Sequence, residues 1–168
     1  MNTANFQESR SEFSEHVIAI NRISKKTKGG NKIGFSALAV VGDRKGKVGV
    51  GLGKAPDVSS AIRKAIVIGK KHMVSVPISS SGTIPFRVDI KLGAARVMLK
   101  PAPPGSGIIA GGAVRNVVAA AGIQNISSKV LGTRNKISNV YATLEALRRL
   151  AQLRENKAVL NEDVKQGK

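Results

Sequence analysis

A phosphate-binding turn is the first chemistry that the residue types and spacing of this sequence suggest. Residues 100–122 read KPAPPGSGIIAGGAVRNVVAAAG, and the segment GSGIIA at 105–110 fits the G-x-G-x-x-G/A pattern of dinucleotide-binding proteins. A glycine-rich turn before a helix offers free backbone N–H groups to an anion. However, three prolines precede the first glycine, and no Asp or Glu occurs between Asp89 and Glu145. We therefore expect no nucleotide cofactor, and we predict a turn that packs between a strand and a helix or docks on a macromolecule.

The residue types that catalysis requires are sparse and far apart. The only histidines, His16 and His72, fall at the edge of a predicted strand and at the end of a predicted helix. Asp89 stands alone among basic neighbours, which indicates a solvated strand residue. No cluster of His, Cys and Asp has the spacing of metal ligands, and cysteine is absent from the chain. We therefore expect no enzyme, no metal site and no cofactor.

Positive charge is the dominant chemical property of the chain. Its 168 residues include 28 Lys and Arg against 10 Asp and Glu, giving a formal net charge of +18. Such an excess opposes compact folding by self-repulsion unless a polyanion neutralises it, and nucleic acid is the leading candidate. An anionic membrane surface is the alternative, although no stretch approaches the roughly 20 apolar residues of a spanning helix. Hydrophobic residues make up 42% of the chain, which indicates a folded protein.

The cations concentrate in the first half of the chain. Thirteen Lys and Arg lie between Arg22 and Lys71, in a predicted basic loop at Lys25–Lys32, at a predicted turn near Arg44–Lys47 and on a predicted helix. We expect these three places to lie close together. Because the chain has only four Phe and one Tyr, recognition through phosphates and RNA shape is expected rather than base stacking. The residues predicted to bind RNA are Arg22, Lys25, Lys26, Lys28, Gly29, Gly30, Lys32, Arg44, Lys45, Lys47, Lys54, Arg63 and Lys64.

Hydrophobic periodicity predicts the strands that position these cations. Three strands are predicted in the first half, over residues 16–23, 33–41 and 47–54. The third alternates apolar residues with Gly49, Gly51 and Gly53, which share one face. A face of bare glycines lets either a packed helix or a phosphate chain approach the backbone closely. Helix packing is the favoured interpretation.

The remaining pattern predicts two small α+β units. A helix begins at Pro56, with an apolar stripe that reaches Met73, and a second clear helix covers residues 138–153. Strands in the second half are predicted over residues 85–92, 94–100 and 125–131. The run Ser79–Gly82 has the composition of a linker. The predicted division is a flexible arm at 1–14, a first domain at 15–78 with a three-stranded antiparallel sheet and a helix, a second domain at 83–155 and a flexible tail at 156–168.

Short motifs along the chain resemble a known protein family. They are NRISK at 21–25, KGG at 28–30, FSAL at 35–38, VGD at 41–43, GxGxGKA at 49–55, KPA at 100–102 and GxGIIAGG at 105–112. With Arg115 they resemble the fifth protein of the small ribosomal subunit, bacterial type, across about residues 15–154. Asn135-Lys136 departs from the Asn-Pro that the family often has there.

The resemblance implies a fold and a function beyond what the residues alone predict. The first domain would resemble a double-stranded-RNA-binding fold. The second would combine a β-rich sheet with two helices and a left-handed β-α-β crossover, against the usual handedness. The family implies a structural constituent of the small ribosomal subunit in the cytoplasm, or alternatively in an organelle. It would bind small-subunit rRNA and affect decoding accuracy.

The resemblance also implies protein partners. They are the fourth and eighth small-subunit proteins, with the third nearby at the channel through which mRNA enters. The residues matching the surface for the fourth protein are Gly105, Gly107, Ile108, Ile109, Gly111, Gly112 and Arg115. A free RNA-processing or RNA-chaperone factor is the alternative function, and a nucleotide-dependent enzyme is the third.

Overall fold

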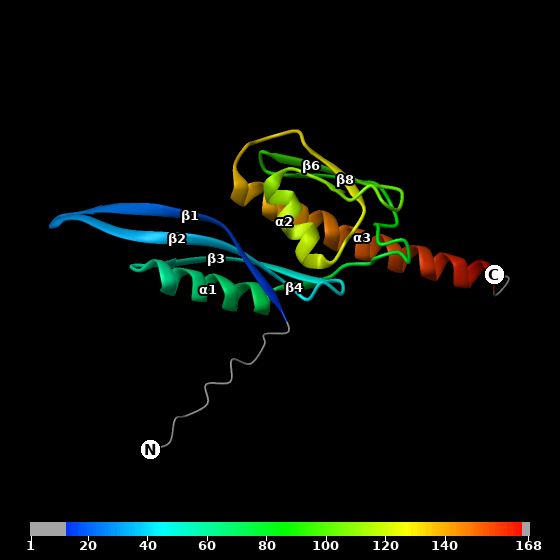
Figure 1. Cartoon of the computed structure of the whole chain (residues 1–168), viewed down its shortest axis with the longest axis horizontal. Helices are drawn as coiled ribbons and strands as arrows, with labels where there is room; N and C mark the ends of the chain where they lie inside the picture. Colours follow the sequence, from blue (N-terminus) through cyan, green and yellow to red (C-terminus); the bar gives the residue numbers. More distant parts are fainter. Residues whose placement is uncertain (1–12, 166–168) are drawn as a thin grey trace, which may run out of the picture.

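The computed structural model describes residues 13–165, and the side chains of residues 13–155. Helices and sheets alternate in four layers (Figure 1). Helix α1 (Val58–Lys71) covers one face of the first sheet. Helices α2 (Gly112–Ala121) and α3 (Lys136–Lys165) lie between the other face and the second sheet. The chain is therefore an α+β protein, as the sequence predicts.

The first sheet is antiparallel, with strand order β1-β2-β3-β4. Its strands are β1 (Ser14–Thr27), β2 (Gly30–Gly42), β3 (Lys47–Ala55) and β4 (Met73–Ser75). The sequence predicts the first three and misses β4, because Met73 also fits the spacing of the helical stripe. The helix ends before Met73 because the N–H of His72 donates to the carbonyls of Ile68 and Gly69. The chain then pairs three residues with β3, too few to show a period of two.

The second sheet is mixed, with strand order β5-β6-β8-β7. Its strands are β5 (Val88–Leu92), β6 (Ala95–Pro101), β7 (Ile108–Ile109) and β8 (Ile126–Val130). The predicted strands at 85–92, 94–100 and 125–131 correspond to β5, β6 and β8. The two-residue β7, which the sequence analysis missed, runs parallel to β8, and α2 connects them in a β-α-β unit.

One apolar core joins the two sheets. Leu38 and Val40 of β2 belong to the same buried cluster as Ile126 of β8 and Leu147 of α3. One buried cluster therefore contains residues from both sides of the chain segment 79–82, where the sequence analysis places the domain boundary. The limits of the two domains remain a prediction.

Regular secondary structure reaches into the segments predicted as arm and tail. Strand β1 begins at Ser14, so the last residue of the predicted arm is already paired, with Gly42 as its partner. The rest of that arm, apart from Phe13, lies outside the described residues. Helix α3 continues to Lys165, so the tail predicted at 156–168 begins inside this helix. Its C-terminal part extends beyond the packed layers (Figure 1).

Candidate nucleic-acid interface

The glycine face of β3 is filled by α1. A Cβ atom added to Gly51 would overlap the carbonyl oxygen of Ala65, and one added to Gly53 would overlap that of Ala61. Helix and strand backbones thus touch directly, which only the absence of a side chain permits. The favoured interpretation, helix packing, is correct, and no phosphate chain can reach this face. The contact holds α1 flat on the sheet, so that its outer side, including the exposed Arg63 and Lys64, faces solvent.

The N-terminus of α1 is capped by the chain's own carboxylate. Asp57 accepts hydrogen bonds from the Ser59 hydroxyl at 2.5 Å and from the Ser60 N–H at 3.1 Å. Mainly the first of these bonds, and then the second, lowers the pKa of Asp57 below its usual value. A negative charge therefore already occupies the positive end of this helix, which disfavours a phosphate there.

Most of the predicted basic loop is a β ribbon. The pairing of β1 with β2 continues to Lys25–Lys32, Lys26–Asn31 and Thr27–Gly30, so only Lys28 and Gly29 form the turn. The Thr27 hydroxyl donates to the Gly30 carbonyl at 2.7 Å, and Gly30 has a φ of +118°. The prediction of a loop over 25–32 was wrong because lysines are tolerated in a strand whose two faces are both solvated. Ribbon residues 20–33 are all exposed (Figure 1).

An open hollow of about 370 Å³ lies at the base of this ribbon. Its cations are Lys25, Lys32 and Lys54, which come from β1, β2 and β3. The apolar residues that line it include Ile23 and Ile33. This is where the structure brings predicted RNA-binding residues from three strands together. An apolar floor between three ammonium groups suits a sugar–phosphate chain, whose sugar is less polar than its phosphates.

Other predicted RNA-binding residues point elsewhere. In β1, Arg22 pairs with Phe35, which packs in the α1-facing cluster, so Arg22 lies on the α1 side of the ribbon. Arg44, Lys45 and Lys47 lie at the opposite end of β2 from the ribbon tip. The expectation that the basic loop and this turn lie close together is wrong, because each occupies one end of a 13-residue strand.

The β2–β3 turn docks on α2. The N–H of Arg44 donates to the carbonyl of Ala120 at 3.0 Å, and the N–H of Gly46 donates to that of Ala121 at 2.9 Å. The Asp43 carboxylate accepts two further N–H groups within the turn. The guanidinium of Arg44 remains exposed, but its backbone belongs to the junction between the two sheets.

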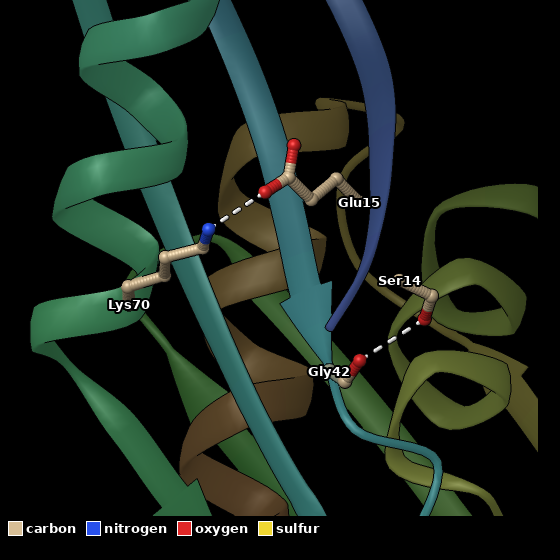
Figure 2. A network of polar contacts seen from close by, with 4 residues as sticks. All are labelled: Ser14, Glu15, Gly42 and Lys70. Atoms are coloured by element: carbon tan, nitrogen blue, oxygen red, sulfur yellow. Dashed lines mark hydrogen bonds and ion pairs between the residues drawn. The ribbon is translucent and has the colours of Figure 1, made fainter. Parts of the chain in front are cut away.

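The start of β1 is fastened to both α1 and β2 (Figure 2). The Lys70 ammonium lies 2.8 Å from the Glu15 carboxylate, and the Ser14 hydroxyl donates to the Gly42 carbonyl at 3.1 Å. The same ammonium lies 5.9 Å from the centroid of the Phe13 ring. Partly exposed pairs of this kind contribute little stability, but they give Lys70 an intramolecular counter-ion.

The glycine-rich stretch at 105–115 lies at the surface after β6 and contains β7 and the first turn of α2. A Cβ atom added to Gly105, Gly107 or Gly112 would meet no other atom within 4 Å. The Arg115 guanidinium donates to the carbonyl of Ile108 at 3.1 Å. Arg115 therefore satisfies a carbonyl of β7 rather than pointing freely into water. Strand β6 ends at Pro101, three residues short of Gly105, and β7 lies between the first glycines and α2. A dinucleotide site instead has a strand that leads directly into the first glycine.

Asn125 is a structural residue that the sequence analysis did not identify. Its side chain is 6% exposed, accepts a hydrogen bond from the Gly107 N–H at 3.1 Å and donates one to the Ser81 carbonyl at 3.1 Å. It therefore ties the glycine-rich stretch to the segment between the sheets. A single Asn at the start of a predicted strand carries no sequence signal for such a role.

Metal-ligand clusters and membrane-spanning helices are absent from the described part of the chain. Between residues 13 and 155, no three His, Cys, Asp or Glu side chains are grouped to hold a metal ion. No helix within residues 13–165 is both long and apolar enough to cross a membrane.

Comparison with known proteins places the two sheets in one family. The family "Ribosomal protein S5, N-terminal domain" matches residues 13–77, and "Ribosomal protein S5, C-terminal domain" matches residues 90–159. The chain belongs to the ribosomal protein S5 family. Small ribosomal subunit protein uS5c of Emiliania huxleyi is 48% identical over 144 residues, covering 86% of this chain and 91% of the relative. Protein uS5 of Thermosynechococcus vestitus is 49% identical over 148 residues, covering 88% and 85%.

Membership of the ribosomal protein S5 family confirms the resemblance found in the motifs and the prediction of a non-enzymatic structural protein. The departure at Lys136 from the Asn-Pro of the S5 pattern leaves the local turn intact. The Asn135 carboxamide oxygen accepts the N–H of Ile137 at 3.0 Å, and the Asn135 carbonyl accepts that of Asn139 at 3.1 Å. Lys136 occupies the first helical position, where proline is common but not required.

Proposed function

We propose that this chain is a structural constituent of the small ribosomal subunit that binds small-subunit rRNA through the cations of its β1–β2 ribbon. The ribosome is that of the cytoplasm or of an organelle. The observation that carries the proposal is the ribbon itself, whose lysines lie on paired strands that extend past the packed layers. Membership of the S5 family supports a ribosomal role.

The charge of the ribbon favours a polyanionic partner. Lys25 and Lys32 lie directly opposite each other in the antiparallel register, an arrangement that destabilises a sheet when both side chains are charged. Within residues 13–155, no ion pair forms with Lys25, Lys26 or Lys28. RNA phosphates in contact with these ammonium groups would relieve the repulsion. Contacts from Arg63 and Lys64 on α1 would extend the same interface.

The second half of the chain supplies the proposed protein contacts. The exposed turn at 105–112 and Arg115 form a surface for the fourth small-subunit protein, while the eighth also contacts the chain and the third lies nearby. This placement lines the channel through which mRNA enters and accounts for an effect on decoding accuracy. The support is the match of this segment to the family motif and the open space around its glycines.

Replacing Lys25, Lys26 and Lys28 together by Ala tests the RNA contacts. Binding to protein-free small-subunit rRNA should weaken, and its salt dependence should flatten by about 0.7 to 0.9 log units for each lost phosphate contact. The matched control replaces Arg148, Arg149 and Arg154 of α3 by Ala, removing three exposed charges elsewhere. A triple-lysine variant with the salt slope of the wild type would refute the proposed contacts.

Co-sedimentation separates a ribosomal constituent from a free RNA-processing or RNA-chaperone factor. The wild-type chain should remain with small subunits through a high-salt wash, because it is anchored by both RNA and protein contacts. A transient factor would be released by the same wash. Loss of the chain from washed subunits would therefore favour the alternative function.

A further inference from the structure

A hollow between the first turns of α2 and α3 is a candidate binding site outside the proposed RNA contacts. Its volume is about 430 Å³. Gly111 and Gly112 line it at the start of α2, and Lys136 and Asn139 line it from α3. The segment that leads from β8 to α3 adds Arg134. Two helix N-termini therefore border the same hollow.

The N-terminus of α2 offers backbone donors that no side chain caps. Its N-cap residue is Gly111, which makes no side-chain hydrogen bond, and its first turn holds no acidic residue. At α1, by contrast, Asp57 supplies both the capping oxygen and the negative charge. The first N–H groups of a helix have no partner within the helix, and the helix dipole makes this end positive. The start of α2 is therefore suited to hold an anion.

Two side-chain cations add positive charge at the same place. Arg134 and Lys136 are exposed, and within residues 13–155 neither of them forms an ion pair. Lys136 occupies the first position of α3, where the helix dipole disfavours a cation, and no acidic residue lies in that turn. No Asp or Glu is among the described residues that line the hollow. Its positive charge is therefore uncompensated by this part of the chain.

A buried hydrogen-bond acceptor restricts which anion fits the hollow. Asn139 is 4% exposed, and its Nδ2 group donates to the carbonyl of Thr133 at 2.9 Å. This bond orients the carboxamide, and its Oδ1 atom has no hydrogen-bond partner within residues 13–155. A buried acceptor without a donor costs free energy, which a bound donor recovers. The hollow therefore favours a ligand that carries a proton it can donate.

A second unpartnered group lies next to this hollow. Within residues 13–155, the only other buried side-chain polar atom without a hydrogen bond is the Ser128 hydroxyl of β8. Ser128 lines a neighbouring hollow of about 410 Å³, and the two hollows share Gly111 and Val130 in their linings. Native proteins leave few buried polar groups unsatisfied. Both exceptions gather around the start of α2, which indicates a site rather than a general packing defect.

Inorganic phosphate has the chemistry that this hollow requires. Near neutral pH it is an anion that keeps an O–H group, so it accepts hydrogen bonds from N–H donors and can donate one to Asn139. Sulfate has the same shape but no proton, so its oxygens would face the Asn139 oxygen unfavourably. The phosphodiester group of RNA also has no proton. The acceptor therefore distinguishes free phosphate from both of these anions.

We propose that the hollow between α2 and α3 is a binding site for inorganic phosphate. The first N–H groups of α2 hold the anion together with Arg134 and Lys136, and its O–H group donates to the Oδ1 atom of Asn139. The site is independent of the proposed function, because its ligand is a small free anion rather than rRNA. Bound phosphate links the first turns of the two helices and offsets part of the self-repulsion of the chain.

Calorimetric titration of the full chain tests the selectivity of the site. Phosphate should bind at one site and at least about tenfold more tightly than sulfate at equal ionic strength, because sulfate leaves the buried acceptor unpaired. Dimethyl phosphate, which models the RNA diester, should bind no better than sulfate. Equal affinities would show general attraction of anions to a basic chain. No saturable binding of phosphate would show that only water reaches Asn139. Either result overturns the proposal.

Substitutions of Gly111 locate the site without damaging the fold. Its φ of −61° suits any residue, and a Cβ atom added there lies 3.8 Å from the Val130 side chain, an ordinary contact. Gly111→Asp should give α2 the kind of cap that Asp57 gives α1, so stability is retained while the carboxylate displaces phosphate. Gly111→Ala adds the Cβ atom without the charge and should keep phosphate binding. Equal phosphate affinity in the two variants would place the ligand elsewhere and overturn the proposal.

Asn139→Ala tests the acceptor directly. It should lower the affinity for phosphate by about tenfold and leave the weak affinity for sulfate unchanged, so that the preference between the two anions disappears. A variant that keeps the preference of the wild type would overturn the assignment of Asn139. If this buried substitution prevents folding, the comparison of anions and the two Gly111 variants still decide the proposal.

Discussion

The two faces of the first sheet are packed in opposite ways, although the same strands supply both. Toward α1, β2 presents Ala37 and Ala39, and β3 presents glycines, so the helix backbone touches the strand backbone. Toward α2 and α3, the alternating residues include Leu38, Val40 and Val50, which interlock with large side chains. The α1 interface depends on the absence of side chains from β3, whereas the α2–α3 interface depends on large side chains that interlock.

The difference predicts opposite responses to mutation. The α1 interface has no space between backbones, so added atoms should damage it while small deletions matter little. The α2–α3 interface is a conventional apolar core, so removed atoms should leave cavities. A one-residue shift of β2 or β3 would exchange the two patterns and break both interfaces at once. The following substitutions test this contrast, from the largest expected effect to the smallest.

Gly51→Val should have the largest effect. Its side chain would enter the backbone of α1 at Ala65 and Gly69, so the helix must leave the sheet. We expect a loss of more than about 4 kcal/mol in the free energy of unfolding. Gly29→Val, at the ribbon tip where a Cβ atom meets nothing within 4 Å, is the matched control. Urea denaturation measures the free energy of unfolding of both variants. Similar values would contradict the statement that the α1 interface has no room for a side chain.

Leu147→Ala should be the next most damaging change. Leu147 is fully buried in the core that both sheets share, and its truncation leaves a cavity that costs about 2 to 5 kcal/mol. Because the core is continuous, hydrogen exchange should accelerate in β2 and β3 as well as in β6. Leu153→Ala, at a position 37% exposed, serves as the control. Faster exchange confined to the second sheet would indicate that the two sheets unfold separately.

Asp57→Ala should destabilise α1 to a smaller extent, and only above acidic pH. The lowered pKa of Asp57 means that its cap stabilises the fold above about pH 4, its unfolded value, and that this stabilisation fades as pH falls through the lower folded value. Wild type and variant should therefore converge in melting temperature at low pH. Asp57→Asn keeps a capping oxygen without the titration, so it should resemble wild type near neutral pH. A wild-type–Ala difference independent of pH would contradict this account.

Arg115→Leu should change stability least of all. Its guanidinium is exposed and makes one hydrogen bond, to the Ile108 carbonyl, so we expect less than about 0.5 kcal/mol. Under the proposed function it should nevertheless raise misreading while subunits still assemble, because the interface with the fourth protein loses a fixed cation. Nonsense readthrough in cells carrying only the variant measures this, together with subunit profiles. Wild-type readthrough with normal assembly would refute the role of Arg115.

Short-range patterns predicted the central part of each long element. Alternation along β2 and β5 identified the buried faces because each strand has at least one face in the core. Pro56 and Asp57 identified the start of α1, since capping depends on neighbouring residues. The glycines of β3 predicted that another group approaches the strand backbone closely, either a packed helix or a phosphate chain. The structure shows that this group is helix α1.

Features that depend on distant residues could not be predicted in this way. β4 and β7 exist because a neighbouring strand pairs with them, and pairs of two or three residues have no period. The layout of the candidate site was harder to predict from the sequence than the fold. The composition identified its cations, but only the register separates the ribbon tip from Arg44, and only the sheet topology collects Lys25, Lys32 and Lys54 around one hollow.

The backbone junction between Arg44 and Ala120 has a mechanical consequence. Strand β2 extends about 40 Å from this junction to the ribbon tip, so the ribbon is a lever arm whose pivot is the C-terminal end of α2. A rotation of α2 by about 5° would move the tip by about 3 to 4 Å. The opposite end of α2 carries the turn at 105–112. A partner that tilts that turn would therefore rotate α2 and displace Lys28. The ribbon would transmit this rotation as a rigid body, without a series of side-chain contacts along its length.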